Sequence, residues 1–546
     1  MTDGERMRWW GWGTDAAAIE LPPAAVALLS GELGIDPAAR TQRVALGEVR
    51  LAPSELGGPA RDALAAVVGL DRVEDGRAVR VSHAAGRSYP DLLRLRSGEL
   101  GHAPDAVVTP AARSQLAPLL AECGRHGIAV VPFGGGTSVV GGVDALRGVH
   151  GAAIALDLRG LDALVDVDTT SLTATVEAGI LGPELERRLA ARGVTLGHFP
   201  QSFEHSTVGG WVATRSAGQA SSGYGRIDEL VEAVAAITPA GPLETLDVPA
   251  TAAGPALREL IVGSEGVLGV ITEATLRVRA APVERRYEGW SLPGFAAGAE
   301  ALRALAQADA LPDVARLSDE DETRLTMALG STGSLGERVG RGYLRLRGRD
   351  GGCLAFTGFE GTRDAVARRR GRAAAILRAH GAVALGQRPG RSWLRGRFAA
   401  PYLRDALLDR AVMVDTLETA TTWTNLHATY AAVGDALRAA LGERGTPPAV
   451  MCHVSHVYRS GASLYFTFIA AQERGAELDQ WRVAKRAATD AIVAAGATVS
   501  HHHAVGADHR DWMAAEVGPL GVELLSAVKA RVDPTAIMNP GKLIPG

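Results

Sequence analysis

Three consecutive glycines at residues 134–136 follow the apolar run 128–132 and precede two hydroxyl residues, Thr137 and Ser138. This pattern predicts a buried strand that ends in a turn without side chains. In such a turn, successive backbone N–H groups can converge on an anion such as pyrophosphate. The turn fits neither common nucleotide pattern, because Val139 replaces the last glycine of G-x-G-x-x-G and no Gly-Lys-Ser/Thr occurs. Taken alone, it fits a tight turn without a ligand at least as well.

Two further glycine-rich blocks favour a ligand. Residues 202–218 offer hydroxyl groups and exposed amides, and residues 263–269 form a bare loop beside a predicted strand. Three loops of this kind could together line a long dinucleotide.

The length of 546 residues predicts at least two domains, because one core rarely grows that large. We expect an N-terminal helical segment at residues 1–100 and a mixed α/β domain at 101–281. A second domain with its own sheet should follow at 282–500, and residues 501–546 should form a loop and a helical tail.

Periodicity predicts the individual elements. Strands are expected at residues 107–108, 128–132, 152–158, 173–178, 275–279 and 463–470, and helices at 115–125, 182–193, 297–308, 364–379 and 520–531, the first capped by Ser114.

Composition excludes several classes of protein. A net charge of -4 leaves no electrostatic footprint for nucleic acid. The three cysteines, Cys123, Cys353 and Cys452, lack the spacing of a disulfide framework or a zinc site, so a reducing cytoplasm is expected. We expect neither a signal peptide nor a membrane span, although contact with a membrane surface stays open. The tryptophans of residues 9–12 could mark such contact, but packing onto the body of the protein is the favoured interpretation.

Three motifs carry a family resemblance: Pro-Phe-Gly-Gly-Gly-Thr-Ser at 132–138, Gln-Ser-Phe-Glu-His-Ser-Thr-Val-Gly-Gly-Trp at 201–211 with 214–217, and Gly-Ser-Glu-Gly-Val-Leu-Gly-Val-Ile-Thr at 263–272. In this order they resemble the FAD domain of the vanillyl-alcohol-oxidase and p-cresol-methylhydroxylase flavoproteins. The resemblance implies an α+β fold, with a two-subdomain FAD-binding domain and a substrate (cap) domain that has its own antiparallel sheet and flanking helices.

The same resemblance implies which residues contact FAD. They are Pro132, Phe133, Gly134, Gly135, Gly136, Thr137, Ser138, Gln201, Ser202, Thr207, Gly210, Thr214, Arg215, Ser216, Ala217, Gly218, Ser264, Glu265, Gly266, Gly269, Val270 and Ile271. Some relatives attach FAD covalently through His or Cys. Here Cys123 precedes the first loop and residues 132–143 contain no histidine, so non-covalent FAD is expected, although a histidine of the cap domain is not excluded.

Within that superfamily, four stretches resemble the alkyldihydroxyacetonephosphate synthases: residues 8–13, 397–405, 461–466 and 501–503. Between residues 284 and 380 little matches beyond Ala315-Arg316-Leu317. The resemblance implies exchange of the acyl group of acyl-dihydroxyacetone phosphate for a long-chain alcohol, which forms an ether bond without net redox change. The flavin would act as an electrophile in this reaction, and a homodimer with possible peripheral membrane contact is expected.

His501, His502 and His503 offer adjacent imidazoles near physiological pH. Neighbouring side chains of an extended segment point to opposite faces, so three in a row cannot easily share one ion. We therefore expect no metal, and a solvated loop is the other alternative. The family resemblance implies that these histidines reach the flavin and the substrate.

Three further residues take roles from the resemblance. Tyr465 would be the acid/base at the substrate carbon, which requires a lowered pKa; without the resemblance it would be a half-buried strand aromatic. Arg404 would bind an anionic group of the substrate, the alternative being an ion pair with Asp405 or Asp409. Arg316 would lie near the flavin.

Two other functions remain open. A flavin dehydrogenase or oxidase of 2-hydroxy acids shares the loops and the Asn-Pro-Gly-Lys ending, but usually has Glu-His-Gly where this chain has His502-His503-Ala504. A flavin-binding protein without catalysis is the third possibility, and the presence of Tyr465 and the histidines argues against it.

Overall fold

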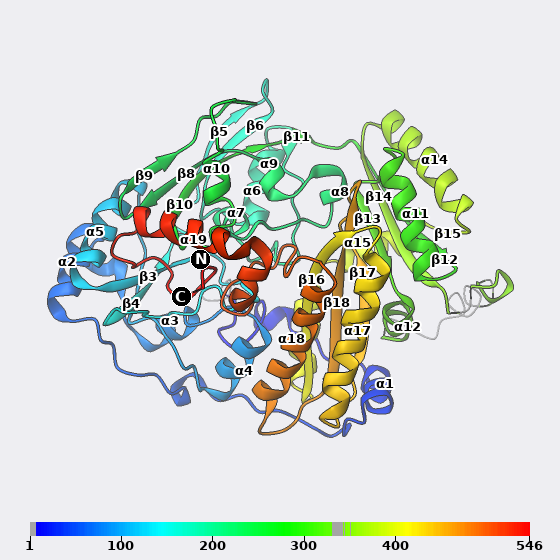
Figure 1. The fold of residues 1–546 in the computed structure, drawn as a ribbon, viewed down its shortest axis with the longest axis horizontal. Helices are drawn as coiled ribbons and strands as arrows, with labels where there is room; N and C mark the ends of the chain where they lie inside the picture. Colours follow the sequence, from blue (N-terminus) through cyan, green and yellow to red (C-terminus); the bar gives the residue numbers. More distant parts are fainter. Residues whose placement is uncertain (1–6, 330–341, 343, 350, 546) are drawn as a thin grey trace.

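The glycine turn ends β3 of a four-stranded sheet in the computed structural model, which describes residues 7–329, 342, 344–349 and 351–545 (Figure 1). The sheet order is β1 (Val73–Glu74), β2 (Ala106–Val108), β4 (Ala152–Asp157) and β3 (Ile128–Phe133). The last three strands run parallel, and the apolar runs that predicted them are buried, as parallel sheets require. Helices α2 (Gly58–Val68) and α5 (Leu116–His126) pack against this sheet.

The predicted cap of α5 is wrong. Ser114 lies inside a 3-10 turn, Arg113–Gln115, and its side chain caps nothing. Instead the side-chain oxygen of Gln115 accepts the N–H groups of Ala111 and Ala112 just before the helix.

A five-stranded antiparallel sheet lies beside the first. Its order is β5 (Leu164–Asp168), β6 (Thr173–Glu177), β10 (Val270–Arg277), β8 (Val231–Thr238) and β9 (Gly241–Glu244). The short strands β7 (Val194–Thr195) and β11 (Arg279–Ala280) pair separately. This region also contains α6 (Gly182–Ala190), α7 (Val208–Thr214), α8 (Ser221–Tyr224), α9 (Ile227–Leu230) and α10 (Arg258–Ile261). The two sheets are the two subdomains expected of the FAD-binding domain.

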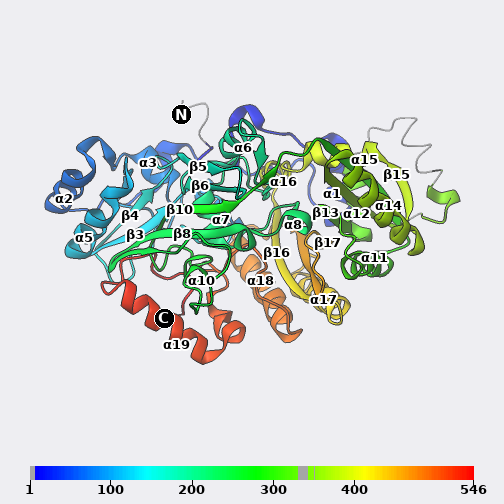
Figure 2. The same cartoon turned by 90° about the horizontal axis from the view of Figure 1, so that it is seen from above.

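The third sheet has seven antiparallel strands, all within residues 284–471. Their order is β15 (Val383–Gly386), β12 (Glu284–Leu292), β14 (Cys353–Gly361), β13 (Val314–Ser318), β17 (Ala449–Val454), β18 (Gly461–Ala471) and β16 (Val412–Thr422). One face is covered by α11 (Phe295–Gln307), α14 (Arg363–Ala379), α17 (Leu426–Glu443) and α18 (Glu477–Ala494) (Figure 2). The antiparallel cap sheet with flanking helices is thus confirmed.

The N-terminal segment extends to the cap sheet. It contains α1 (Pro23–Leu33), α3 (Arg77–Ser82) and α4 (Tyr89–Ser97), and α1 packs with α16 (Ala400–Leu408) on the face of the cap sheet opposite the four helices. Trp10 and Trp12 are 9% and 3% exposed. The guanidinium groups of Arg8 and Arg43 lie 4.4 and 3.7 Å from the Trp10 ring centroid. The packing interpretation of this cluster is therefore confirmed for both tryptophans.

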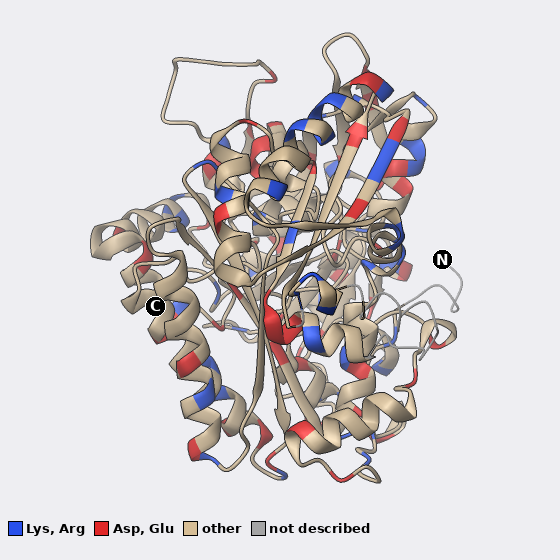
Figure 3. Cartoon of the chain, turned by 90° about the vertical axis from the view of Figure 1, so that its right-hand side faces the viewer, with Lys and Arg blue, Asp and Glu red and all other residues tan. Residues whose placement is uncertain are grey.

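The chain returns to the FAD-binding domain at its C-terminus. α19 (Met513–Val532) starts earlier than residue 520, is kinked at Gly518, and packs on the core of the five-stranded sheet (Figure 1). Two further helices are α12 (Glu320–Leu329) and α15 (Gln387–Gly396). Among the described residues no helix is both long and apolar enough to cross a membrane. Acidic and basic positions are interspersed over the side of the molecule seen in Figure 3.

Candidate active site

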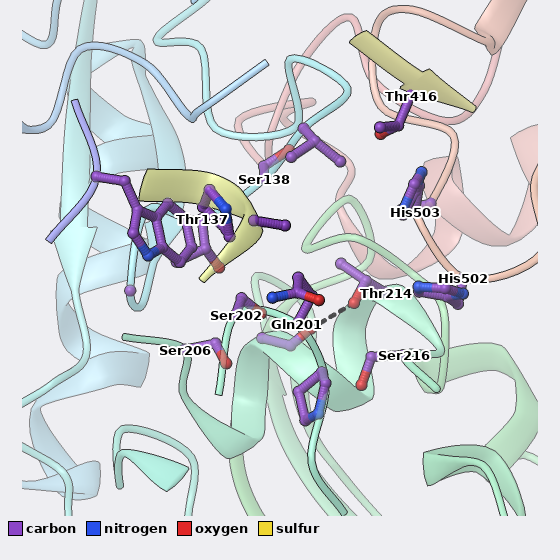
Figure 4. Close-up of a pocket in the computed structure, with 18 of the residues that line it drawn as sticks. Thr137, Ser138, Gln201, Ser202, Ser206, Thr214, Ser216, Thr416, His502 and His503 are labelled. Atoms are coloured by element: carbon purple, nitrogen blue, oxygen red, sulfur yellow. Dashed lines mark hydrogen bonds between the residues drawn. The ribbon is translucent and has the colours of Figure 1, made fainter. Parts of the chain in front are cut away.

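A cavity of about 520 Å³ lies between the glycine-rich loops and the cap sheet. Thr137 and Ser138 lie on one wall, residues 201–216 form a second, and Thr416, His502 and His503 face them from the cap side (Figure 4). All three predicted loops contribute to one site, although they are far apart in the sequence.

The glycine turn is bare because its surroundings leave no room for side chains. A Cβ on Gly135 would lie 1.8 Å from the carbonyl oxygen of His205, and one on Gly134 would lie 2.3 Å from the hydroxyl of Thr207. Gly136 has a φ of +64°, which favours glycine. In the described part of the chain, the amides of residues 134–138 donate to no protein acceptor. Five free N–H groups in sequence fit the pyrophosphate of FAD.

The second and third loops are held rigidly. Thr207 caps α7 through the N–H of Gly210, and the ring N–H of Trp211 donates to Ser206 at 2.6 Å. Glu265 in the third loop accepts the N–H groups of Val505 and Gly506 at 2.8 and 2.7 Å. Burial raises the pKa of Glu265 to about 7. This carboxyl group therefore ties the histidine loop of residues 501–503 to the FAD-binding domain.

Most predicted FAD contacts line the cavity, and four do not. Arg215 ends α7 in the left-handed conformation, and its guanidinium turns outward to pair with Glu259. Val270 packs in the core of the four-stranded sheet. Gly218 and Ser264 also lie outside the lining. Sequence motifs mark which loop binds, but a backbone turn decides which side chains face the ligand.

The cap sheet presents alternate residues to the cavity. Tyr465, Thr467 and Ile469 of β18 line it, whereas Leu464, Phe466 and Phe468 pack under the four helices. This is the two-residue period of a strand with one buried face. β18 therefore contributes both polar side chains, Tyr465 and Thr467, and an apolar one, Ile469, to the cavity wall.

Tyr465 lies in the cavity as predicted, but its predicted pKa is wrong. Burial raises the pKa to about 12, against a smaller lowering by Thr416. Its ring stacks on His453 with centroids 4.6 Å apart and meets His503 edge-on at 5.4 Å. Burial also lowers the pKa of His503 to about 3, so this imidazole is neutral and supplies no positive charge that would lower the pKa of Tyr465.

Arg404 lines the cavity, and only part of its guanidinium group is hydrogen-bonded to the protein. Its Nη1 donates to the carbonyl of Arg87 at 2.6 Å. Its Nε and Nη2 are buried and have no hydrogen-bond partner among the described residues. The alternative ion pair is not formed, because Asp405 pairs with Arg8 and Asp409 with Arg96. Two orphaned donors of one guanidinium fit an anionic ligand.

Arg316 lines the cavity with its charge already neutralised. Its Nη2 donates to Glu322 at 2.7 Å and contacts the ring of His453 at 3.0 Å. Burial acts to raise the pKa of Glu322, but His453 and Arg316 outweigh it and lower the pKa. Arg316 is thus part of a neutral ionic network at the cavity wall.

His502 and His503 line the cavity, and His501 lies behind them. The premise that neighbouring imidazoles point to opposite faces is wrong for His501 and His502, because residues 501–503 form bends and not an extended strand. Nδ1 of His502 lies 2.5 Å from Glu418, and Nδ1 of His501 lies 3.6 Å from it. Burial acts to raise the pKa of Glu418, yet His502 and His501 hold it well below its usual value.

Sequence reasoning missed Glu418, Thr416, His453 and His456. Glu418 is a carboxylate in the middle of the mostly buried strand β16, and it faces Tyr465 in the register of the sheet. A charged residue in such a strand is a signal that could have found it. The two histidines three apart in Cys452-His453-Val454-Ser455-His456 are another.

Comparison with known proteins agrees with this architecture. The family described as FAD binding domain matches residues 104–247, and the family described as FAD linked oxidases, C-terminal domain, matches residues 281–543. A solved structure of p-cresol methylhydroxylase with substrate bound superposes with a TM-score of 0.66 at 16% identity, over 90% of this chain and 97% of that one. At that identity the likeness establishes the fold alone.

The alkyldihydroxyacetonephosphate synthases are closer. The enzyme from Dictyostelium discoideum is 35% identical over 482 residues, which cover 87% of this chain and 79% of the relative. The enzyme from Trypanosoma brucei brucei is 32% identical over 571 residues, 99% of this chain and 93% of the relative. A solved alkyldihydroxyacetonephosphate synthase superposes with a TM-score of 0.85 at 30% identity, over 99% of both chains. The chain therefore belongs to the alkyldihydroxyacetonephosphate synthase family of FAD-dependent enzymes.

Proposed function

We propose that the protein exchanges the acyl group of acyl-dihydroxyacetone phosphate for a long-chain alcohol. The ester oxygen leaves with the fatty acid as a carboxylate, and the alcohol oxygen takes its place on the same carbon. The alcohol proton is released, so the exchange needs no external oxidant or reductant. The product is an ether lipid precursor. The observation that carries the proposal is one cavity that offers an unpaired buried cation, a glycine cradle and an apolar wall.

The cofactor end of the cavity is built by the three loops. The amides of residues 134–138 would hold the pyrophosphate, with the hydroxyls of Thr137 and Ser138 beside them. Bound there, FAD supplies an electron-poor ring system beside the substrate. Non-covalent binding remains the proposal for this chain.

Arg404 would bind the phosphate of the substrate. Its free Nε and Nη2 can donate two charge-assisted hydrogen bonds, and the carbonyl of Arg87 fixes the guanidinium through Nη1. Because the site is buried, water competes weakly for these donors. Arg404 thus orients the substrate and leaves its reacting carbon free.

Tyr465 would act as the acid/base of the reaction: it would take a proton from the reacting carbon of the substrate. Its raised pKa means that the phenol carries its proton before substrate binds. To accept a substrate proton, the hydroxyl must pass its own proton on. Thr416 and the neutral His503 lie beside it, and an imidazole that accepts at one nitrogen and donates from the other would relay this proton to the departing carboxylate. His502 and His503 would assist this transfer and help position the flavin, and Arg316 would keep the wall neutral through its pair with Glu322.

The apolar end of the cavity would hold the two hydrocarbon chains. The lining there comes from the N-terminal segment, α12, α16 and the cap strands: Leu21, Leu28, Leu29, Leu325, Leu403, Leu407, Val414, Met451 and Ile469. Burying a methylene group is worth about 0.8 kcal/mol, so a long chain gains much of its binding energy from such a wall. Contact with a membrane surface, a cytoplasmic location and a homodimer stay predictions.

The test uses purified holoprotein under anaerobic conditions. We expect acyl-dihydroxyacetone phosphate to bleach the flavin absorption, and labelled fatty alcohol to appear in an ether product. A 2-hydroxy acid such as lactate or glycolate should leave the spectrum unchanged. Reduction by lactate or glycolate without incorporation of the alcohol would instead identify a dehydrogenase.

A further inference from the structure

Four side chains that can ligate a metal converge behind the polar wall of the cavity. They are Glu418 of β16, His456 after β17, and His501 and His502 of the C-terminal loop. One nitrogen or oxygen atom of each lies within 4.8 Å of the others. Glu418, His456 and His501 are 2%, 3% and 5% exposed, so the cluster is shielded from bulk water.

The separations of the ligand atoms suit a small divalent ion. Nδ1 of His501 lies 3.1 Å from Nδ1 of His502 and 3.6 Å from Oε1 of Glu418. Nε2 of His456 lies 3.7 Å from the same oxygen. Around a tetrahedral zinc ion with bonds of about 2.0–2.1 Å, neighbouring ligand atoms lie about 3.3–3.4 Å apart. The 2.5 Å contact of His502 with Oε2 of Glu418 would have to lengthen, and any pair of ligand atoms near the 4.8 Å limit would have to shorten.

Two of the imidazoles are also fixed from the outside. Nε2 of His501 is bonded to the hydroxyl of Tyr458 at 2.6 Å, and Nδ1 of His456 to the hydroxyl of Ser221 at 2.6 Å. When each histidine donates its outer N–H to its hydroxyl partner, the nitrogen that faces Glu418 carries a lone pair. Metal-bound histidines are held in this way by an outer partner.

The burial of the Glu418 carboxylate also indicates a bound cation. Both of its oxygens are fully buried and accept no hydrogen bond of good geometry from the described residues. With His456 and His501 in the tautomer that turns a lone pair to it, this buried carboxylate is costly unless a positive charge lies among these atoms.

We propose that Glu418, His456, His501 and His502 bind one zinc ion. Three imidazole nitrogens and one carboxylate oxygen form a ligand set typical of zinc. The ion would join β16, the turn after β17 and the C-terminal loop, which are up to 84 residues apart in the sequence. It would thereby fix the loop that carries His503 against Tyr465. The zinc ion would position this loop and would not itself bind substrate. The proposal therefore holds whichever substrate the cavity binds.

The test measures zinc in the FAD-loaded protein. Protein produced with added zinc is freed of loose metal by gel filtration and its zinc content is measured by mass spectrometry. Four ligands with closed coordination predict about one zinc per chain. Glu418→Gln and His456→Gln should lose it, whereas His126→Gln should keep it. His126 is the matched control, because it is an exposed histidine that lies 3.7 Å from the half-buried Glu122, outside the cluster.

A spectroscopic measurement on the wild-type protein tests the proposal even if the variants do not fold. Zinc-edge X-ray absorption should show nitrogen and oxygen neighbours with the scattering of three imidazoles. Wild-type protein that takes up no zinc, or variants that bind it as tightly as wild type, would overturn the proposal. In that case the cluster is a direct contact between Glu418 and His502 without a metal ion.

Discussion

Arg404→Met removes the one cavity cation whose Nε and Nη2 are free of protein partners in the described residues. A hydrogen bond to a charged group is worth about 1.5–3 kcal/mol, so two such bonds to a phosphate contribute about 3–6 kcal/mol. At about 1.4 kcal/mol for each factor of ten, kcat/KM for the phosphorylated substrate should fall by about 10² to 10⁴. Methionine fills a similar volume, so the flavin spectrum should persist.

Arg404→Met should lower activity, but it should not lower the stability of the protein. In the absence of ligand, each buried unpaired donor costs about 1–3 kcal/mol, and the variant no longer carries that cost. We therefore expect Arg404→Met to melt at or above the temperature of wild type while it loses activity. Functional sites commonly trade stability for binding in this way.

The assay compares kcat/KM for acyl-dihydroxyacetone phosphate with that for its dephosphorylated analogue. Wild type should prefer the phosphorylated substrate strongly, and Arg404→Met should lose that preference. Arg410→Met, two residues after the end of the same helix, is the control, because Arg410 donates to the carbonyl oxygen of Pro37 outside the cavity. A loss of kcat/KM below about threefold, or loss of FAD in place of substrate binding, would refute the assignment.

Three further outcomes are expected. Tyr465→Phe should retain FAD and lower kcat of exchange by at least about 10², the lower end of what a positioned acid/base contributes, with KM little changed; unaltered turnover would remove Tyr465 from the reaction. Leu28→Trp narrows the apolar wall and should lower kcat/KM for long alcohols more than for short ones, whereas Leu70→Trp, at a site 69% exposed, should change neither. The pKa of Glu265 is raised to about 7, so its neutral form stabilises the fold at low pH, and up to about 3 kcal/mol should be lost as pH rises from about 4.5 through 7. Burial also raises the pKa of Asp144, Asp319 and Asp508 to about 7, so urea denaturation should show a smaller loss of stability across this range in Glu265→Gln than in wild type, and not an absence of loss.

The sequence was sufficient to predict that the backbone of the first loop must be free of side chains. Gly134 and Gly135 are needed because the chain passes within van der Waals distance of residues 205–207, and only a run without side chains allows this. The alternation of residues 463–470 likewise predicts a strand with a half-buried Tyr465, as found, whereas its place at the cavity was implied by the family resemblance. These features depend on local rules, which a single sequence displays.

Features that depend on tertiary neighbours could not be predicted. The pKa of Tyr465 is raised because the cap sheet buries it, and nothing near residue 465 in the sequence reports that burial. Glu418 and His456 reach the histidine loop only through the pairing of β16, β17 and β18. Arg215 was placed on the cavity by its motif, yet the left-handed turn at that residue directs it to Glu259.

The N-terminal segment contributes Trp12, Leu28 and Leu29 to the cavity, although the FAD loops begin more than 100 residues later. If the proposed function holds, part of the wall for the hydrocarbon chains and the loops for the cofactor are encoded in separate stretches of the gene. A swap of residues 7–35 with a relative should then transfer part of the preference for hydrocarbon length and leave the flavin loops unchanged. Exchange of this one short segment would be a route by which the lipid preference of such a protein diversifies.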